Sequence, residues 1–406
     1  MAEELVINTG RPDLVKFTLP MVGGMGLILG FLTGNVVGSP WMGLVLGLVI
    51  GVGLGYVLNT MVPSKAMGRW AVILGFALVG LLSGGLGGAL GGAIIGAIIS
   101  WFAYWIGRGS YRDDVPIYST PGQTLWWNFF LFICGAIFIF LITPILVVLP
   151  LSFNAEDFFT FTPEMLRLDP EGYSLKHYRD FFQTDDWQLA LKNSLVIAPI
   201  ATIISVSLGT LAAIGLSQSH VPGRRAIMAI LISPMIVPLI ISATGMFFFY
   251  STLGNFLEDS LGMSKSIVGY IKVILAHAVL GIPFVIITVT ATLVGFDRSL
   301  TRAAANMGAD PVTTFFRVQM PLILPGVISG GLFAFITSFD EVVVVLFVGS
   351  AAQKTLPWQM FIGLREQISP TILAVATILV CISIALLTTL ELLRRRSERL
   401  RGMSPG

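Results

Sequence analysis

Two adjacent carboxylates, Asp340 and Glu341, lie within an apolar stretch of this chain, in the run ITSFDEVVVVLFVG. Carboxylates inside a membrane span are costly unless they face a water-filled cavity or a cation. One interpretation is that the pair lines a translocation path and favours a cationic solute. The other is that it marks a helix break capped by backbone N–H groups, where Ser338 can serve as a further cap.

A polar segment between two apolar runs carries the signals of a short helix followed by a sharp turn. Asp297 or Ser299 can cap this helix, which is predicted to end at Asn306. Gly308 follows at the position where a helix C-terminus takes a left-handed residue, which glycine adopts without a Cβ clash.

The same segment then predicts a second short helix. Asp310-Pro311 is typical of an N-cap and a first helical position, and Pro321 begins the next apolar run. Two short helices at a fixed angle would form a rigid, charged knob; an ordinary inter-helix loop is the alternative. The flanking arginines are Arg298, Arg302 and Arg317.

Several kinds of chemistry have no motif in this chain. GxxxxGK[ST], HExxH and paired CxxC are all missing, so no P-loop ATP site, no metal site and no catalytic residues are predicted. A net charge of +2 gives no indication of nucleic-acid binding. The three histidines are far apart; for His277, within an apolar run, we expect a packing role, with a pathway role as the alternative.

The composition indicates that most of the chain lies in lipid. It is 55% hydrophobic and only 11% charged, against about 25% charged in soluble domains. A bilayer core requires roughly 20 apolar residues per helix, and strands are not expected because the runs lack alternation. Cys134 and Cys381 lie inside these runs and are predicted to be buried free thiols. Six apolar runs follow the first third of the chain: 127–151, 190–216, 226–250, 268–294, 322–348 and 371–393.

The distribution of basic residues predicts the orientation, because Lys and Arg near span ends stay in the cytoplasm. Every second loop is basic, and the long loop 152–189 is acidic instead. We therefore expect both termini and the segment 295–321 in the cytoplasm and the acidic loop outside. The basic positions are Arg108, Arg112, Arg224, Arg225, Arg298, Arg302, Arg317 and Arg394–Arg396.

The first 110 residues are unusually rich in glycine at a spacing of four, in three series that begin at Gly26, Gly43 and Gly80. Such small-residue faces let helices approach closely in lipid. We predict one helical hairpin over 20–62 and a second over 70–107 with a turn near Gly84–Gly88; a long span plus a re-entrant segment is the alternative. The expected role is packing, with regulation or assembly as a second possibility.

The polar segment resembles the Glu-Ala-Ala signature of permease subunits in binding-protein-dependent ABC importers. Ala303, Ala304, Gly308 and Pro321 match that signature, and Val318 and Met320 are conservative replacements. Arg302 stands where the family has glutamate, which is a departure. The resemblance implies that this segment is a cytoplasmic loop that couples the permease to a separate ATPase.

A second resemblance extends over roughly 125–398. The run from Ser338 through Asp340, Glu341 and the following valines, with Leu356-Pro357 and Ser369-Pro370 after it, is similar to the second permease of spermidine/putrescine importers. The implied fold is an all-α integral membrane protein. We assign 1–110 to an extension of about four helices, 111–126 to a cytoplasmic linker, 127–398 to a six-helix permease with its coupling loop at 295–321, and 399–406 to a cytoplasmic tail.

The function implied by these resemblances is that of a permease subunit in an ATP-driven ABC importer of the bacterial inner membrane, forming half of the path for a small organic cation such as a polyamine. The implied partners are a second permease, two copies of an ATPase that binds ATP and Mg²⁺, and a periplasmic or lipid-anchored solute-binding protein. Alternatives are the same importer class carrying an opine, an aminophosphonate or an amino acid, and an ion-coupled carrier.

Overall fold

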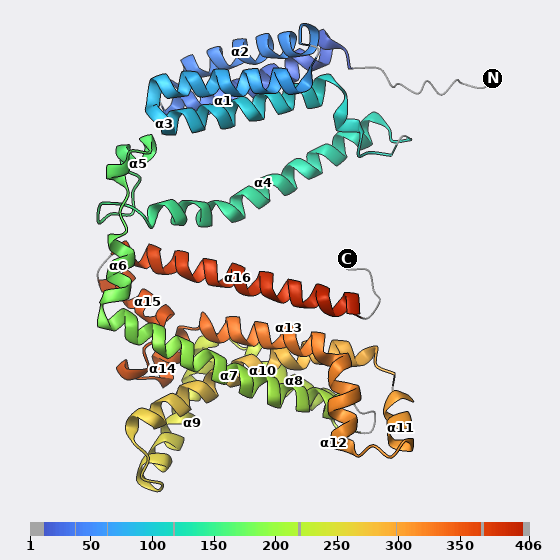
Figure 1. Ribbon diagram of the computed structural model, residues 1–406, viewed down its shortest axis with the longest axis vertical. Helices are drawn as coiled ribbons and strands as arrows, with labels where there is room; N and C mark the ends of the chain where they lie inside the picture. The colour runs from blue at the N-terminus through green and yellow to red at the C-terminus, as the bar shows by residue number, and fades with distance from the viewer. Residues whose placement is uncertain are drawn as a thin grey trace, which may run out of the picture. The chain divides into compact units, whose positions relative to one another are not determined.

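The computed structural model describes residues 12–400, apart from 37, 63, 117, 218–220, 298 and 367–368. His220, Arg298 and the tail beyond Leu400 therefore lie outside the described residues. Across the described ranges every regular element is a helix, and the β-type pairing is one isolated bridge between Asn154 and Tyr173, which confirms the predicted all-α class (Figure 1). Nine helices in these ranges are long and apolar enough to cross a membrane.

The chain divides into two compact units, Met1–Ser174 and Leu175–Gly406. The first unit holds the predicted extension, the linker and the first helix of the predicted six-helix permease. Its elements are η1 (Leu14–Thr18), α1 (Leu19–Val36), α2 (Pro40–Thr60), α3 (Lys65–Gly107), η2 (Ser110–Arg112), α4 (Pro121–Leu151), α5 (Pro163–Arg167) and η3 (Pro170–Gly172).

Helices α1 and α2 form a hairpin in which the two backbones touch. A Cβ added at Gly30 would overlap the carbonyl oxygen of Gly43 and lie 2.7 Å from the Cα of Gly47. The same holds at Gly26, where an added Cβ would overlap the Gly47 carbonyl oxygen. The predicted first hairpin and its glycine interface are therefore confirmed, because only glycine leaves room for this approach.

Helix α3 is a hairpin as well, although its ladder is nearly continuous. Gly84 and Gly85 leave the helical conformation, with φ of +63° at Gly85. A Cβ added at Gly96 would lie 2.9 Å from the carbonyl oxygen of Val72, whereas a straight helix would separate these residues by about 36 Å. The chain therefore reverses at Gly84–Gly85, which confirms the predicted second hairpin. Counting the arms of α3 separately, the nine candidate spans become the ten that the sequence predicts.

Helix α4 begins with a complete capping box. The Thr120 hydroxyl accepts from the Gln123 N–H, and the Gln123 side chain accepts from the Thr120 N–H at 2.9 Å. No residue of its most apolar window is buried by the described parts of the chain. The exposed faces of α4 and α16 include Cys134 and Cys381, so the prediction that both thiols are buried is wrong. An apolar run predicts that a residue lies within the membrane. It does not reveal whether protein or lipid covers the side chain.

The second unit packs around three long helices, α7, α10 and α13. Gly209 and Gly330 both meet Val285 of α10, and the Ser205 hydroxyl donates to the Ala278 carbonyl oxygen at 2.9 Å. The elements of this unit are α6 (Lys176–Gln183), α7 (Asp185–Ser217), α8 (Arg224–Ile236), α9 (Leu239–Asp259), α10 (Lys265–Val294), α11 (Ser299–Asn306), α12 (Pro311–Thr314), η4 (Phe315–Gln319), α13 (Met320–Phe339), α14 (Val343–Val348), η5 (Ala351–Gln353), α15 (Leu356–Glu366) and α16 (Thr371–Leu400).

Two of the six predicted runs are not single helices. The run 226–250 is interrupted at Val237, whose ψ of 137° is extended, because the following Pro238 disfavours helical backbone before it. The membrane helix α9 therefore starts at Leu239 and reaches Asp259, beyond the predicted end. The run 322–348 is interrupted between Phe339 and Val343, at the paired carboxylates.

Candidate functional site

The predicted coupling segment begins with an aspartate cap. One carboxylate oxygen of Asp297 accepts from the Ser299 N–H at 2.8 Å, and the other accepts from the Ser299 hydroxyl at 2.7 Å. The hydroxyl and then the backbone N–H of Ser299 lower the pKa of the Asp297 carboxyl, because both favour its charged form. Helix α11 starts at Ser299, so of the two predicted caps Asp297 is the one that acts.

Helix α11 ends in a Schellman motif. Gly308 has φ of +86°, its N–H bonds the Ala305 carbonyl oxygen at 3.0 Å, and the Ala309 N–H bonds the Ala304 carbonyl oxygen at 3.1 Å. Ala304 is buried, while Arg302 and Ala303 are exposed. The predicted turn is confirmed.

The second helix of the segment starts as predicted but does not stop. The Asp310 carboxylate accepts from the Thr313 N–H at 3.1 Å. The Thr313 side chain and then this N–H lower the pKa of the exposed carboxyl, because both favour its charged form. From Pro311 the chain stays helical to Phe339, through α12, η4 and α13. The prediction of a separate short helix ending before Pro321 is therefore wrong. Proline interrupts an α-helical ladder, and here the wider π-turn of η4, closed by the Met320 N–H on the Phe315 carbonyl oxygen, precedes it.

The coupling segment exposes apolar side chains beside its charges. Met307 is 82% exposed, Val312 62% and Phe316 61%, and the flanking Arg302 and Arg317 are exposed too. Val318 in η4 and Met320 at the start of α13 are half-buried. Exposed apolar groups rimmed by charge are typical of a protein interface. Sequence reasoning did not single out Met307 and Val312, although both adjoin the predicted turn.

At the helix break the two carboxylates differ. Glu341 is 8% exposed, and its carboxylate accepts from the Val344 N–H at 2.9 Å, so it caps α14. Asp340 follows the last residue of α13 and has an exposed side chain. Ser338 does not cap the break: its hydroxyl is 2.8 Å from Nδ1 of His277 on α10. This pairing gives His277 a packing partner, while its buried Nε2 has none among the described residues.

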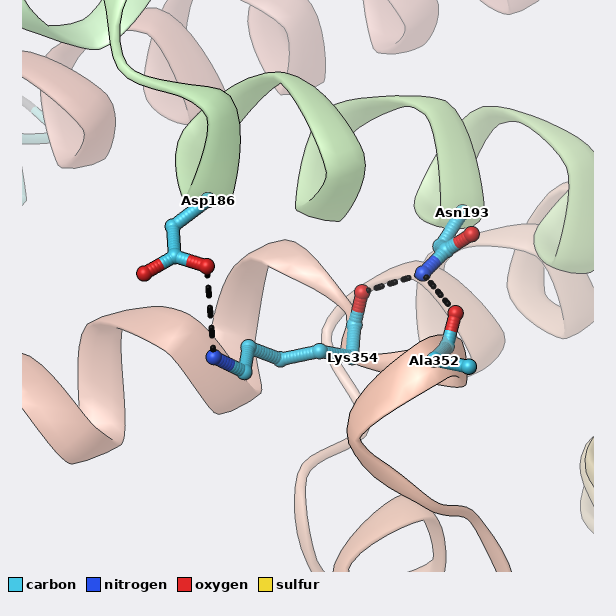
Figure 2. Close-up of polar contacts among 4 residues, drawn as sticks. All are labelled: Asp186, Asn193, Ala352 and Lys354. Atoms are coloured by element: carbon cyan, nitrogen blue, oxygen red, sulfur yellow. Dashed lines mark hydrogen bonds and ion pairs between the residues drawn. The ribbon is translucent and has the colours of Figure 1, made fainter.

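After α14 the chain returns through a loop that α7 holds in place. Asn193 on α7 donates from its amide to the carbonyl oxygens of Ala352 at 3.0 Å and Lys354 at 2.8 Å (Figure 2). The Tyr270 hydroxyl donates to the Asn193 side-chain oxygen. Asp186 lies 3.8 Å from the Lys354 ammonium, also drawn in Figure 2. Sequence reasoning missed this site, whose signal is an asparagine inside an otherwise apolar run.

Comparison with known proteins identifies relatives over about two thirds of the chain. The family model described as binding-protein-dependent transport system inner membrane component matches residues 205–401. The spermidine/putrescine transport system permease protein PotC of Haemophilus influenzae is 30% identical over 271 residues, covering 67% of this chain and 97% of the relative. The putrescine transport system permease protein PotI of Escherichia coli is 28% identical over 268 residues, covering 66% and 88%.

Solved structures share the fold. A chain in the crystal structure of a bacterial alginate ABC transporter, in complex with an alginate-bound periplasmic protein, matches with a TM-score of 0.52 at 15% identity. The match covers 67% of this chain and 94% of that one. The glycine-rich extension lies outside the residues that the family model matches.

Proposed function

The chain belongs to the inner-membrane permease family of binding-protein-dependent transport systems, and on that premise we propose that it forms half of an import path for a polyamine of the spermidine or putrescine type. The observation that carries the substrate class is the likeness to the polyamine permeases along nearly their whole length. The exposed Asp340 at the break between α13 and α14 supplies a carboxylate that a cationic solute can meet.

Asp340 is the better candidate of the two carboxylates for lining the path. Glu341 is buried, and its carboxylate caps the N-terminus of α14 by accepting from the Val344 N–H. A carboxylate in a low-dielectric surrounding attracts a nearby ammonium group more strongly than it would in bulk water. Asp340 would thus lower the barrier for a solute carrying two or more ammonium groups.

The coupling segment would transmit the motion of a partner ATPase. The exposed side of α11 would dock in the ATPase, with Arg302 at the contact. Because the helix is unbroken from Pro311 to Phe339, a push on α12 would reach the carboxylates at the far end of α13. ATP and Mg²⁺ would be bound by two ATPase copies, a second permease would complete the path, and a periplasmic or lipid-anchored binding protein would deliver the solute.

The proposed membrane topology follows from the positions of the basic loops, which stay in the cytoplasm. Both termini and the coupling segment would lie in the cytoplasm, and the loop after α4 would lie outside. Cysteines placed at 155–170 should then react with an impermeant reagent from outside, and cysteines at 396–405 only from inside. Labelling of both segments from the same side would contradict this orientation.

Uptake of labelled putrescine or spermidine by the full complex in proteoliposomes tests the substrate. Asp340→Asn removes the charge and keeps the shape, and we expect it to cut uptake about tenfold, or 1.4 kcal/mol. Glu341→Gln is the matched control, because its side-chain oxygen can still accept from the Val344 N–H; uptake should stay within about twofold. A wild-type complex that moves a neutral or anionic solute but no polyamine would refute the cationic substrate.

A further inference from the structure

The glycine-rich extension lies outside the residues that the family model matches, and its second hairpin contacts the loop that follows α4. Helix α5 packs against α3 at the end where its two arms join, as Figure 1 shows. A Cβ added at Gly87 would overlap the Leu166 carbonyl oxygen and lie 3.2 Å from the Cα of Arg167. Gly85 faces the same part of α5: a Cβ added there would lie 3.7 Å from the Arg167 carbonyl oxygen. The contact is therefore between two backbones, and glycine at 87 is a condition for it.

Helix α5 belongs to a loop that is folded in its own right, over residues 152–174. Asn154 is fully buried and donates to the carbonyl oxygens of Phe158 at 3.0 Å and Thr160 at 2.9 Å. The Tyr173 hydroxyl donates to the Met165 carbonyl oxygen at 2.9 Å, which ties the end of the loop to α5. These internal hydrogen bonds make the loop rigid, so a contact that restrains α5 restrains the whole loop.

The charge pattern places both partners of this contact on one side of the membrane. Lys65 and Arg69 begin the first arm of α3 and Arg108 follows the second, so the tip at Gly84–Gly85 points outward. Helix α4 starts after Arg108 and Arg112 and ends at Leu151, so the loop that follows it is outside as well. The tip of α3 and the loop can touch only if both lie on the same side of the membrane, so the contact agrees with the charge pattern.

We propose that the second glycine hairpin is a support for the outer loop 152–174, holding it through the backbone contact at Gly87. The support fixes part of the outer surface onto which a solute-binding protein docks; this last step rests on the proposed importer function. The relatives match the permease without this extension, so the support is an addition to the shared machinery and not a part of it.

The test measures release of the loop directly, in right-side-out membrane vesicles that contain the full complex. Trypsin is added from outside, and cleavage after the exposed Arg167 is followed by mass spectrometry. Gly87→Val should push α5 off the hairpin, and cleavage should become about tenfold faster, since proteolysis follows the open population. Gly91→Val is the matched control: it lies one turn further along the same arm, and its added Cβ meets no atom within 4 Å.

Each outcome decides a separate point. If cleavage is faster in Gly87→Val only, the hairpin holds the loop as proposed. Equal cleavage rates in wild type and both variants would overturn the proposal. If Gly87→Val does not accumulate in the membrane, Gly87→Ala is used, because the first side-chain carbon already produces the overlap. Cleavage confined to inverted vesicles would refute the orientation proposed for the importer, while the comparison between variants would still report on the contact.

A second measurement addresses docking. In Gly87→Val, the concentration of binding protein that gives half-maximal uptake should rise about fivefold, whereas ATPase activity without binding protein should stay unchanged. An unchanged half-maximal concentration despite faster cleavage would confine the role of the hairpin to holding the loop and would overturn the docking step.

Discussion

Helices meet in different ways in the two units of this protein. In the extension, α1 and α2, and likewise the two arms of α3, meet through the backbones of facing glycines, such as Gly30 with Gly47 and Gly80 with Gly88. In the second unit, α7, α10 and α13 pack through branched side chains such as Val285 and Ile323, and hydrogen bonds tie distant segments together. The first kind of contact is made mainly between backbones, whereas in the second unit glycines such as Gly209 and Gly330 face Val285, and polar side chains add ties between distant segments.

A valine at the centre of the first hairpin tests the backbone contact between α1 and α2. In Gly30→Val the side chain would overlap the backbone of α2, and we expect destabilisation of roughly 3 kcal/mol or more, with little protein in the membrane. Gly24→Val is the control on the same helix, because its added Cβ meets nothing within 4 Å. Membrane accumulation and thermal stability in detergent are measured. Similar loss in both variants would mean that glycine matters here for another reason.

Asn193→Leu tests the polar ties of the second unit. It leaves the carbonyl oxygens of Ala352 and Lys354 and the Tyr270 hydroxyl without their partner, at a cost of roughly 2 kcal/mol in stability. Asp186→Ala removes only a long and partly exposed ion pair and should cost less than about 0.5 kcal/mol. Thermal unfolding of the purified complex gives both values, and equal effects would contradict the central position of Asn193.

Gly308 separates conformational from steric reasons for glycine. An added Cβ there meets no atom within 4 Å, but φ of +86° strains any other residue by about 1–2 kcal/mol. Gly308→Val should tilt α11 and uncouple ATP hydrolysis from uptake while the protein still inserts. Gly295→Val, equally open and at φ of −89°, is the control. Normal uptake per ATP hydrolysed in Gly308→Val would contradict the coupling role.

Arg302→Glu should have the smallest effect. The side chain is exposed, and glutamate is the residue that the family signature carries there. We expect stability within about 0.5 kcal/mol and uptake within about twofold of wild type. Co-purification of the ATPase is the direct measurement. Loss of the ATPase from the variant would show that the partner surface is matched to the arginine.

The features predicted correctly follow from local rules. A glycine series at a spacing of four leaves few structures other than close helix pairs, and Asp310-Pro311 and Gly308 act within a few residues of themselves. The errors arise where a rule meets its surroundings. Pro238 ends a helix inside an apolar run, whereas Pro321 lies within a helix because a π-turn precedes it.

Long-range pairings were beyond sequence reasoning. Asn193 and Ala352 are 159 residues apart, and nothing near either residue indicates the other. The same is true of His277 and Ser338, so the predicted use of Ser338 as a cap at the helix break was wrong. Which carboxylate of the adjacent pair is buried depends on the packing of α14, and the identity of the two side chains does not reveal it.

The contact between Gly87 and α5 also has a consequence for the order of synthesis. Leu166 leaves the ribosome about eighty residues after Gly87, or roughly 4–16 seconds later at the usual rates of translation. The hairpin can therefore be folded in the membrane before the loop is made. The loop would then meet a finished surface at the moment α4 delivers it to the outer side. In this protein the hairpin is therefore complete before the loop that follows α4 is made, and it can serve as a template for that loop.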